Sequence, residues 1–334
     1  MNNLDILNLD ILNKKKLLTD LKYDVYGKYG FYYYVPMAES YTVQIPVTVS
    51  CSYNKCLYCD LNSNKKFKEL SLDEIEQNII KLKTLSELRK NNNARFLLAG
   101  GNPFVLNTNK LINIAELIKK YFNSCDYISC FARADDILRK SDEDLKILRA
   151  AGYNRLCIGL ESGSDKVLEF QQKGLTREDN LKAMRKLDEA NIKYSGYIML
   201  GLGGQDLSAE HVEQTSSMLN LARPFELTVV TLVLFKGAKL IEKVKSREFK
   251  RMGPYETFKE GRELLNNLNI NVIWNATHKT NLYPVKGRLP EHKDLLLRRI
   301  DEVINSLSDK NNLKQYELKR WQNWCVDPGT GNNL

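Results

Sequence analysis

The sequence lacks every apolar segment that an exported or membrane-spanning protein would need. Its N-terminus alternates Asn, Asp and Leu without an apolar core, so we expect no secretory signal. No uncharged apolar run reaches the length of a transmembrane helix. We therefore expect a cytoplasmic protein without a membrane partner. Its seven cysteines are then expected as thiols rather than disulfides.

An excess of acidic side chains is also missing. The chain has 50 basic and 41 acidic residues, a net charge of +9. Much of the excess is diffuse lysine, which favours a solvated surface. Binding to RNA or another polyanion is the less favoured alternative. A chain of 334 residues can bury the core of one α/β domain with extensions or of two smaller domains.

Histidine is scarce, and this bears on three clustered cysteines. Cys51, Cys56 and Cys59 lie within nine residues, after a β-like run. A structural zinc site needs four protein ligands, but the first histidine is His211 and the nearest other cysteine is Cys125. A local zinc site is therefore not favoured. Three thiolates can instead hold three irons of a cubane iron–sulfur cluster and leave the fourth iron open for chemistry.

From residue 41 onward, predicted strands alternate with predicted helices. Alternation of this kind predicts a parallel sheet with right-handed crossovers. Six such units before residue 240 favour an α/β fold built as a partial (β/α)6 TIM-type barrel over a Rossmann sheet. Strands are predicted at 41–50, 95–99, 127–132, 155–160, 193–200, 227–235 and 271–274. Helices are predicted from 72 onward and at 111–122, 141–151, 165–171, 176–190, 211–222, 255–268 and 291–307.

These elements predict a division of the chain into four parts. Residues 1–40 are an N-terminal helical extension, and residues 41–240 form the partial barrel. Residues 241–310 are a C-terminal strand and helix extension that completes the domain. Residues 311–334 are a helical tail, at 313–324, and a disordered end. Neither flank has room for a cobalamin-binding domain or a small RNA-binding barrel, so we expect no appended recognition domain.

Glycine-rich or polar turns follow the predicted strands. In parallel α/β barrels, the carboxyl ends of the strands form the edge where ligands bind. The turn Gly100-Gly101-Asn102-Pro103 allows a close backbone approach, although most Gly-Gly pairs only turn the chain. Arg133 and Glu161 supply a cation and an acceptor for a ligand with a carboxylate and a diol; the alternative is a salt bridge between them. The Gly-rich turn after residue 200 lacks the lysine of a phosphate loop.

Together these motifs resemble the radical S-adenosylmethionine (SAM) superfamily over residues 41–307. The likeness is to a group of anaerobe and archaeal iron–sulfur oxidoreductases with a Cys-x4-Cys-x2-Cys loop. The segments that carry it are Cys51–Asp60, Gly100–Pro103, Arg133–Asp136, Gly159–Gly163 and Gly201–Gly204, with Thr277–Asn281 and Gly287–Pro290 specific to that group.

The resemblance implies two cofactors. A 4Fe-4S cluster is held by Cys51, Cys56 and Cys59. The family's Gly-Gly-Glu-Pro motif holds the amino group of SAM, and here Asn102 replaces the glutamate and accepts a hydrogen bond without charge assistance. The implied SAM contacts lie at the strand ends and in the cysteine loop: Tyr58, Gly100, Gly101, Asn102, Ser129, Arg133, Glu161, Ser162, Gly163 and Gly201.

The resemblance also implies an enzyme that works under anaerobic conditions. An electron from the cluster, supplied by flavodoxin or ferredoxin, would cleave SAM into methionine and a 5′-deoxyadenosyl radical. That radical would take hydrogen from an unidentified small molecule or side chain. The alternatives are a non-catalytic redox sensor or assembly factor, and an RNA-modifying radical SAM enzyme. His278 and Asn281 are candidate catalytic residues on the substrate side; the alternative for His278 is a local hydrogen bond.

Overall fold

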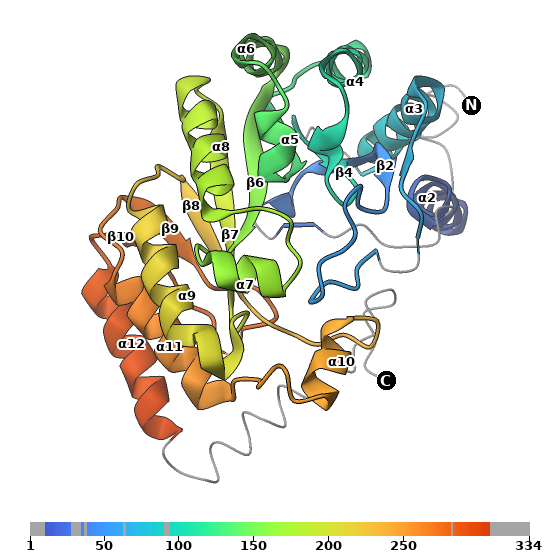
Figure 1. Cartoon of the computed structure of the whole chain (residues 1–334). Coiled ribbons are helices and arrows are strands. Elements are labelled where there is room, and N and C mark those ends of the chain that lie inside the picture. The colour runs from blue at the N-terminus through green and yellow to red at the C-terminus, as the bar shows by residue number, and fades with distance from the viewer. Residues whose placement is uncertain are drawn as a thin grey trace. The chain divides into compact units, whose positions relative to one another are not determined.

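The computed structural model describes residues 11–27, 35–36, 39–62, 65–89, 94–281 and 283–307 (Figure 1). The chain forms two units. The first comprises Met1–Ser52, Lys65–Ala132 and Lys140–Leu156, and the second comprises Tyr53–Asn64, Arg133–Arg139 and Cys157–Leu334. The predicted tail helix at 313–324 and the disordered end lie outside the described residues, as does the start of the N-terminal extension.

In the first unit, three parallel strands form the centre. Strand β4 (Arg95–Ala99) pairs with β1 (Val43–Pro46) on one side and with β5 (Tyr127–Ala132) on the other. Phe96, Leu97 and Leu98 in β4 are fully buried. A parallel strand covered on both faces has a continuous apolar sequence, which is why this short run forms a central strand.

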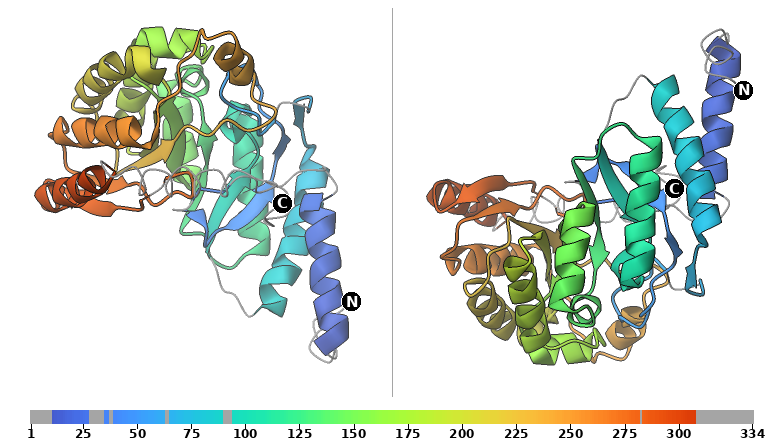
Figure 2. Two further views of the ribbon diagram at one scale, coloured as in Figure 1. Left: turned by 90° about the horizontal axis from the view of Figure 1, so that it is seen from below. Right: turned by 90° about the horizontal axis from the view of Figure 1, so that it is seen from above.

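Helices flank these strands. They are α2 (Ile11–Tyr26), α3 (Leu72–Leu88), α4 (Thr108–Tyr121) and α6 (Asp142–Ala151), with a 3-10 turn η3 (Pro103–Val105) and a small hairpin of β2 (Thr48–Val49) and β3 (Lys68–Glu69). Capping boxes at Ser71 and Ser141 begin α3 and α6 and satisfy the free N–H groups of the first turn. Helix α2 lies along α3 (Figure 2).

Strand β6 (Tyr153–Glu161) begins in the first unit and ends in the second. In the second unit the strand order continues through β7 (Lys193–Leu200), β8 (Glu226–Thr231), β9 (Val272–Asn275) and β10 (Lys286–Leu289). Pairing is parallel from β7 to β9, and β10 runs antiparallel to β9. The carboxyl ends of β7 and β8 therefore lie at the same edge of the sheet.

The helices of the second unit are α5 (Ala134–Leu138), α7 (Asp165–Phe170), α8 (Arg177–Glu189), α9 (Gly204–Leu219), α10 (Leu240–Lys245), α11 (Pro254–Asn266) and α12 (Lys293–Ser306). Helix α11 packs between α9 and α12, on the outer side of the strands (Figure 2). No helix in the described part of the chain is long and apolar enough to cross a membrane.

The predicted α/β fold with parallel strands is confirmed, and the four-part division stays a prediction. Several predicted bounds are wrong. The strand predicted at 41–50 is divided into β1 and β2, and the helix predicted at 111–122 begins at Thr108. Helix α9 begins at Gly204 rather than at 211, because a contact with the distant Lys250 carbonyl stabilises its first turn instead of a local cap. Strand β8 ends at Thr231 rather than at 235, because its partner β7 ends at Leu200, the residue that pairs with Thr231. Helices α5 and α10 and strands β3 and β10 were not predicted from the sequence.

Candidate functional site

In the first unit, the glycine turn after β4 lies directly against the first cysteine. Gly101 N donates a hydrogen bond to Ser50 O at 3.0 Å. A Cβ atom added at Gly101 would lie 2.6 Å from Cys51 Cα, closer than real Cβ contacts come. Gly100 has a φ of +154°, and a Cβ there would collide with the Thr48 hydroxyl. Only glycines allow this turn to approach the Cys51 backbone.

Asn102 connects the same turn to the residue after Cys51. Its side chain is buried, and its Oδ1 accepts a hydrogen bond from Ser52 N at 3.1 Å. Ser52 Oγ lies 3.1 Å from Oδ1 and 3.0 Å from Nδ2 of the same amide. Asn102 therefore fixes the backbone that follows Cys51 and holds it beside the glycine turn.

Ser129 has different partners from the other predicted SAM contacts of the first unit. It lies opposite Leu97 in the register, before the end of β5, and is fully buried. Its hydroxyl donates at 3.0 Å to Glu39, which also accepts from Tyr127 OH and pairs with Arg155. The structure thus places Ser129 in a buried polar cluster and does not bring it to the turn at residues 100–102.

In the second unit, the loop that carries the second and third cysteines is held by the segment after α7. Leu57 N donates to Gln171 O at 3.0 Å. Tyr53 OH donates to Gln172 O at 2.8 Å. Backbone carbonyls of the segment after α7 therefore fix both the start and the middle of the loop at residues 53–62.

Arg133 binds the same two segments. Its guanidinium lies 3.9 Å from the centre of the Tyr53 ring, within the range of a cation–π contact. Its Nη2 donates to Lys173 O at 3.0 Å, and its Nε pairs with Asp135 at 3.0 Å. The side chain is buried, so these contacts hold a cation beside the cysteine loop.

A buried ion pair lies next to the cysteine loop. Lys173 Nζ is 3.1 Å from Glu161 Oε1 and 3.4 Å from Tyr58 OH. Glu161, at the carboxyl end of β6, has a φ of +65°, which is uncommon for a residue with a side chain. A Cβ at Gly159 would lie 2.6 Å from Glu161 Oε1 and 3.0 Å from Lys173 Nζ. Glycine at that position leaves the space that the pair occupies.

Burial and neighbouring charges together set the protonation states of Lys173 and Tyr58. Burial alone would lower the pKa of Lys173, but the charges of Glu161 and Cys56 outweigh it and raise that pKa above its usual value. Burial, and then the charges of Glu161 and Cys56, raise the pKa of Tyr58 well above its usual range. Lys173 is therefore a cation and Tyr58 a neutral phenol at physiological pH.

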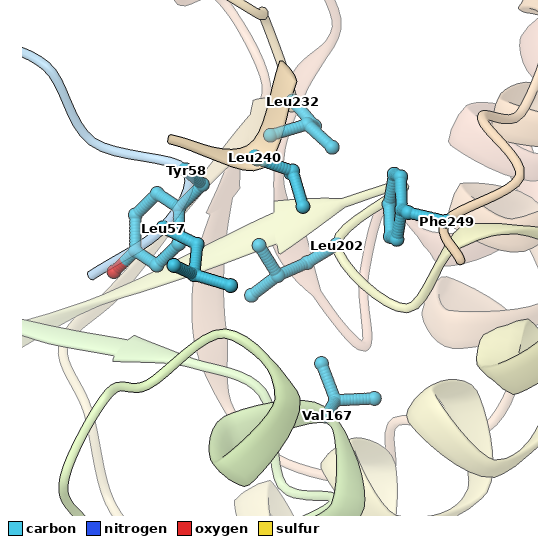
Figure 3. Packing of buried hydrophobic residues seen from close by; sticks show 7 residues of the cluster. All are labelled: Leu57, Tyr58, Val167, Leu202, Leu232, Leu240 and Phe249. Atoms are coloured by element: carbon cyan, nitrogen blue, oxygen red, sulfur yellow. The ribbon is translucent and has the colours of Figure 1, made fainter. Parts of the chain in front are cut away.

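An apolar cluster covers the cysteine loop. Leu57 and Tyr58 pack with Leu202, Leu240 and Phe249, and the side chains converge in Figure 3. The other members of this cluster are Val167 and Leu232, and Cys56 and Cys59 pack against it. The β8–α11 connection is also fixed through its backbone, because Leu240 N donates to Leu57 O at 2.8 Å. An apolar shell of this kind controls how solvent reaches a metal site.

The glycine turn after β7 is held by a buried carboxylate. Gly201 N donates to Glu260 Oε1 at 2.6 Å, and the Ser208 hydroxyl donates to the other oxygen of Glu260. A Cβ at Gly204 would lie 2.7 Å from Lys250 O, so this glycine allows the β8–α11 connection to approach. Gly201 itself has a φ of +79°.

Ser162 and Gly163 face α9. Ser162 is fully buried, and its hydroxyl lies 2.8 Å from His211 Nδ1. Gly163 N donates to Thr215 Oγ1 at 2.8 Å. His211 Nε2 lies 4.0 Å from Glu260, so the buried polar groups at the ends of β6 and β7 are close but are not joined by a hydrogen bond. Burial lowers the pKa of His211, against the charge of Glu260.

The substrate-side candidates are bound to the ends of β8 and β9. Asn281 Nδ2 donates to Val229 O at 2.7 Å and to Ala276 O at 2.9 Å, and Thr231 Oγ1 lies 2.8 Å from its Oδ1. Asn281 also lines a cavity of about 40 Å³ on the side of α11 and α12. Both donor hydrogens of Asn281 therefore bind backbone carbonyls.

His278 makes the local hydrogen bond that the sequence analysis held as its alternative. Its Nδ1 lies 2.8 Å from Thr280 Oγ1 and accepts from Thr280 N at 3.3 Å. Burial, and then the charge of Lys279, lower the pKa of His278 to about 4. The imidazole is therefore neutral at physiological pH. A catalytic role for His278 or Asn281 stays a prediction.

The structure brings the predicted residues into separate groups. Within the first unit, Cys51 meets the turn at residues 100–102. Within the second, Arg133 and the Glu161–Lys173 pair lie beside the loop that carries Cys56, Tyr58 and Cys59. Gly201 is bonded to Glu260, which lies near the histidine that contacts Ser162.

Sequence reasoning missed Lys173 and Glu260. Glu260 had a visible signal, because it lies on the buried face of α11 with Thr257 and Leu264, where an acidic residue is unusual. Lys173 had none, since a lysine in a turn after a helix is ordinary.

The three cysteines supply thiolates, the ligand type of iron–sulfur clusters. In the described part of the chain, no three His, Cys, Asp or Glu side chains lie close enough to hold one metal ion. Thiolates of a cubane each bind a different iron, so they do not converge on one point. In the first unit the glycine turn packs against Cys51, and in the second an apolar cluster packs against Cys56 and Cys59.

Comparisons with known proteins agree with this chemistry. The sequence model of the Radical SAM superfamily matches residues 45–216, more than half of the chain. The heme chaperone HemW of Bacillus subtilis is 28% identical over 169 residues, which are 48% of this chain and 42% of that protein. An uncharacterized protein of Methanocaldococcus jannaschii is 30% identical over 95 residues, 28% of this chain and 29% of that protein. The chain thus spans less than half the length of these relatives.

A solved structure shows the same fold. Coproporphyrinogen III oxidase (HemN) from Escherichia coli, described as a radical SAM enzyme, matches with a TM-score of 0.53 and 18% identity. The match covers 67% of this chain and 51% of that chain. This chain belongs to the radical SAM superfamily, whose cofactors are a 4Fe-4S cluster and S-adenosylmethionine.

Proposed function

We propose that this enzyme cleaves SAM reductively and uses the 5′-deoxyadenosyl radical to take hydrogen from a small molecule or an amino-acid side chain. The observation that carries the proposal is the set of contacts around the cysteine loop. Charged groups and an apolar cover surround Cys56 and Cys59, while the glycine turn supports Cys51. When bound, the cluster supplies the electron that breaks the carbon–sulfur bond of SAM.

In this proposal the chain's own residues bind and orient the cofactors. The thiolates of Cys51, Cys56 and Cys59 hold the cluster. The turn at residues 100–102 receives the amino group of SAM through backbone and amide oxygens. Gly201 has no side chain that would separate its backbone from the adenine, and Glu260 fixes the turn by accepting a hydrogen bond from the Gly201 N–H.

Arg133 and Glu161 are proposed as contacts to the carboxylate and the ribose of SAM. Both side chains are buried and held in place, Arg133 by the Tyr53 ring and Glu161 by Lys173. Lys173 orients Glu161 and offsets its charge, so that a hydroxyl donor and the positive sulfonium of SAM meet an oriented carboxylate. Held groups of this kind cost no reorganisation during the reaction. Ser129, Ser162 and Gly163 stay predictions, because their described contacts are with Glu39, His211 and Thr215 rather than with the cysteine loop or the turn at residues 100–102.

Two other functions are kept as alternatives. The identity to a heme chaperone favours an assembly role without substrate turnover as the second candidate. An RNA substrate is the other, and the net charge of +9 is its support. The RNA alternative differs from the proposed function in where the hydrogen taken by the radical comes from, and the assembly role differs in that no radical is formed.

The formation of 5′-deoxyadenosine, and the source of the hydrogen that it carries, separate the three functions. Extract from cells grown in heavy water would be divided into small molecules, protein and RNA, and each fraction given to the reconstituted enzyme with SAM and dithionite. We expect deuterium in 5′-deoxyadenosine with the small-molecule or protein fraction. Deuterium from the RNA fraction alone would favour RNA modification. No 5′-deoxyadenosine above a Cys56→Ala control would favour the assembly role.

A further inference from the structure

The connection between β8 and α11 carries a concentrated positive charge. Residues 236–251, called the basic strap here, contain seven basic and two acidic residues, a net charge of +5 in a chain whose total is +9. The basic residues are Lys236, Lys239, Lys243, Lys245, Arg247, Lys250 and Arg251, and the acidic ones are Glu242 and Glu248. None of this charge is used by the proposed SAM site.

The basic strap lies on the cysteine loop. Leu240 N donates to Leu57 O at 2.8 Å, and Gly237 N donates to Asp60 Oδ2 at 3.3 Å. Its apolar side chains Leu240 and Phe249 belong to the cluster that packs against Cys56 and Cys59. One side of the strap therefore covers the loop that carries two of the proposed cluster ligands.

Most basic side chains of the strap are exposed, whereas Lys243 and Arg251 are partly buried. Lys236, Lys239 and Arg247 are exposed, and no ion pair involves them within the described residues. Among the described residues, ion pairs of the strap join Lys243 with Glu248, Lys245 with Glu242, and Lys250 with Asp206. All three are partly exposed, and pairs of this kind are weak. The strap therefore keeps a net positive field at its surface.

A cluster that cleaves SAM must receive one electron for each cleavage, and this inference rests on that proposed function. The electron has to come from a donor that approaches the cysteine loop closely. We infer that the basic strap is the docking surface for a small acidic electron-transfer protein of the flavodoxin or ferredoxin type. The reduced donor loses one electron, the cluster gains it, and no bond forms or breaks in this step.

Charge complementarity suits this partner. Weak electron-transfer complexes bury little surface, so opposite charges supply much of their orientation and speed. Electrostatic steering raises association rates by about 10- to 1,000-fold, and salt removes the effect. An apolar underside with a basic outer face therefore lets the strap shield the cluster and attract the donor.

The test compares two charge-reversed variants of the full chain. Lys236→Glu/Lys239→Glu changes the strap by four charges, and Arg298→Glu/Arg299→Glu changes exposed residues of α12 by the same amount. Binding of an acidic flavodoxin is measured by calorimetric titration at low and high salt. We expect at least tenfold weaker binding for the strap variant at low salt, little change for the α12 variant, and a smaller difference at high salt.

Activity gives a second readout. We expect the flavodoxin-driven rate of 5′-deoxyadenosine formation to fall at least tenfold in the strap variant, while the dithionite-driven rate stays within twofold of the wild type. A retained dithionite rate also shows that the variant folds and keeps its cluster.

Two outcomes would overturn the inference: equal losses of flavodoxin binding in both variants, or no loss of flavodoxin binding in the strap variant. If the strap variant keeps its flavodoxin binding but no longer retains total tRNA, the strap is assigned to nucleic acid. If the wild type forms no 5′-deoxyadenosine even with dithionite, the proposed function fails, whereas strap-dependent flavodoxin binding still stands.

Discussion

Replacing Gly101 by alanine is expected to displace the first cysteine of the cluster motif. The new Cβ would lie 2.6 Å from Cys51 Cα and Cβ and 2.7 Å from Cys51 N, whereas ordinary contacts begin at 3.4 Å. Backbone atoms must therefore move by roughly 0.8 Å, which exceeds the ±0.2 Å tolerance of metal–ligand distances about fourfold. We expect Gly101→Ala to cost about 1–3 kcal/mol of folding stability and to lose most of its cluster.

The assay is iron and sulfide content after anaerobic reconstitution, with the visible absorbance of the cluster as a second signal. Gly203→Ala is the matched control, because its nearest atom would be Leu207 O at 3.0 Å and a shift of a few tenths of an ångström relieves it. Cys51→Ser gives the value expected when the first ligand is lost. A Gly101→Ala protein with a full wild-type complement of iron would refute the role of the turn in supporting Cys51.

Three further changes test other parts of the site. Lys173→Met leaves Glu161 as an unpaired buried carboxylate, so urea unfolding is expected to show a loss of about 3–5 kcal/mol, with part recovered when Glu161→Gln is added; no recovery would contradict the pairing. Glu260→Ala leaves Gly201 N–H without its acceptor, and SAM titration is expected to show about tenfold weaker binding, whereas Glu260→Gln stays near the wild type. Because the folded pKa of His278 is lowered to about 4, its contribution to stability is present above about pH 6.5 and is lost as pH falls toward 4. Melting temperatures should therefore fall less in His278→Gln than in the wild type over that window, and parallel curves would count against it.

Much of the fold could be predicted because local rules decide it. The predicted bounds of β4, β5 and β7 match the structure, since each is an apolar run that ends at a glycine or a polar residue. Capping boxes at Ser71 and Ser141 fixed the starts of two helices from four-residue patterns. The cysteine triplet and the glycine turn after β4 could also be predicted, because each is a short local pattern.

The rest depends on contacts between residues distant in the sequence. Helix α9 begins at Gly204 because Lys250 O accepts a hydrogen bond from Gln205 N at 2.8 Å. No local sequence pattern predicts a partner 45 residues away. The basic strap has ordinary loop composition, and only its packing on Leu57 gives it a place beside the cysteines. Lys173 likewise gains its importance from Glu161, twelve residues earlier in the chain.

The central claim is that this chain cleaves SAM by one electron from a cluster on Cys51, Cys56 and Cys59. The most direct measurement is quantification of 5′-deoxyadenosine and methionine after anaerobic reconstitution, reduction with dithionite and addition of SAM. Wild-type protein should form both products in equal amounts over several turnovers, and Cys56→Ala should form neither. Equal product from the two proteins, or none from a wild type with a full complement of iron, would contradict the account.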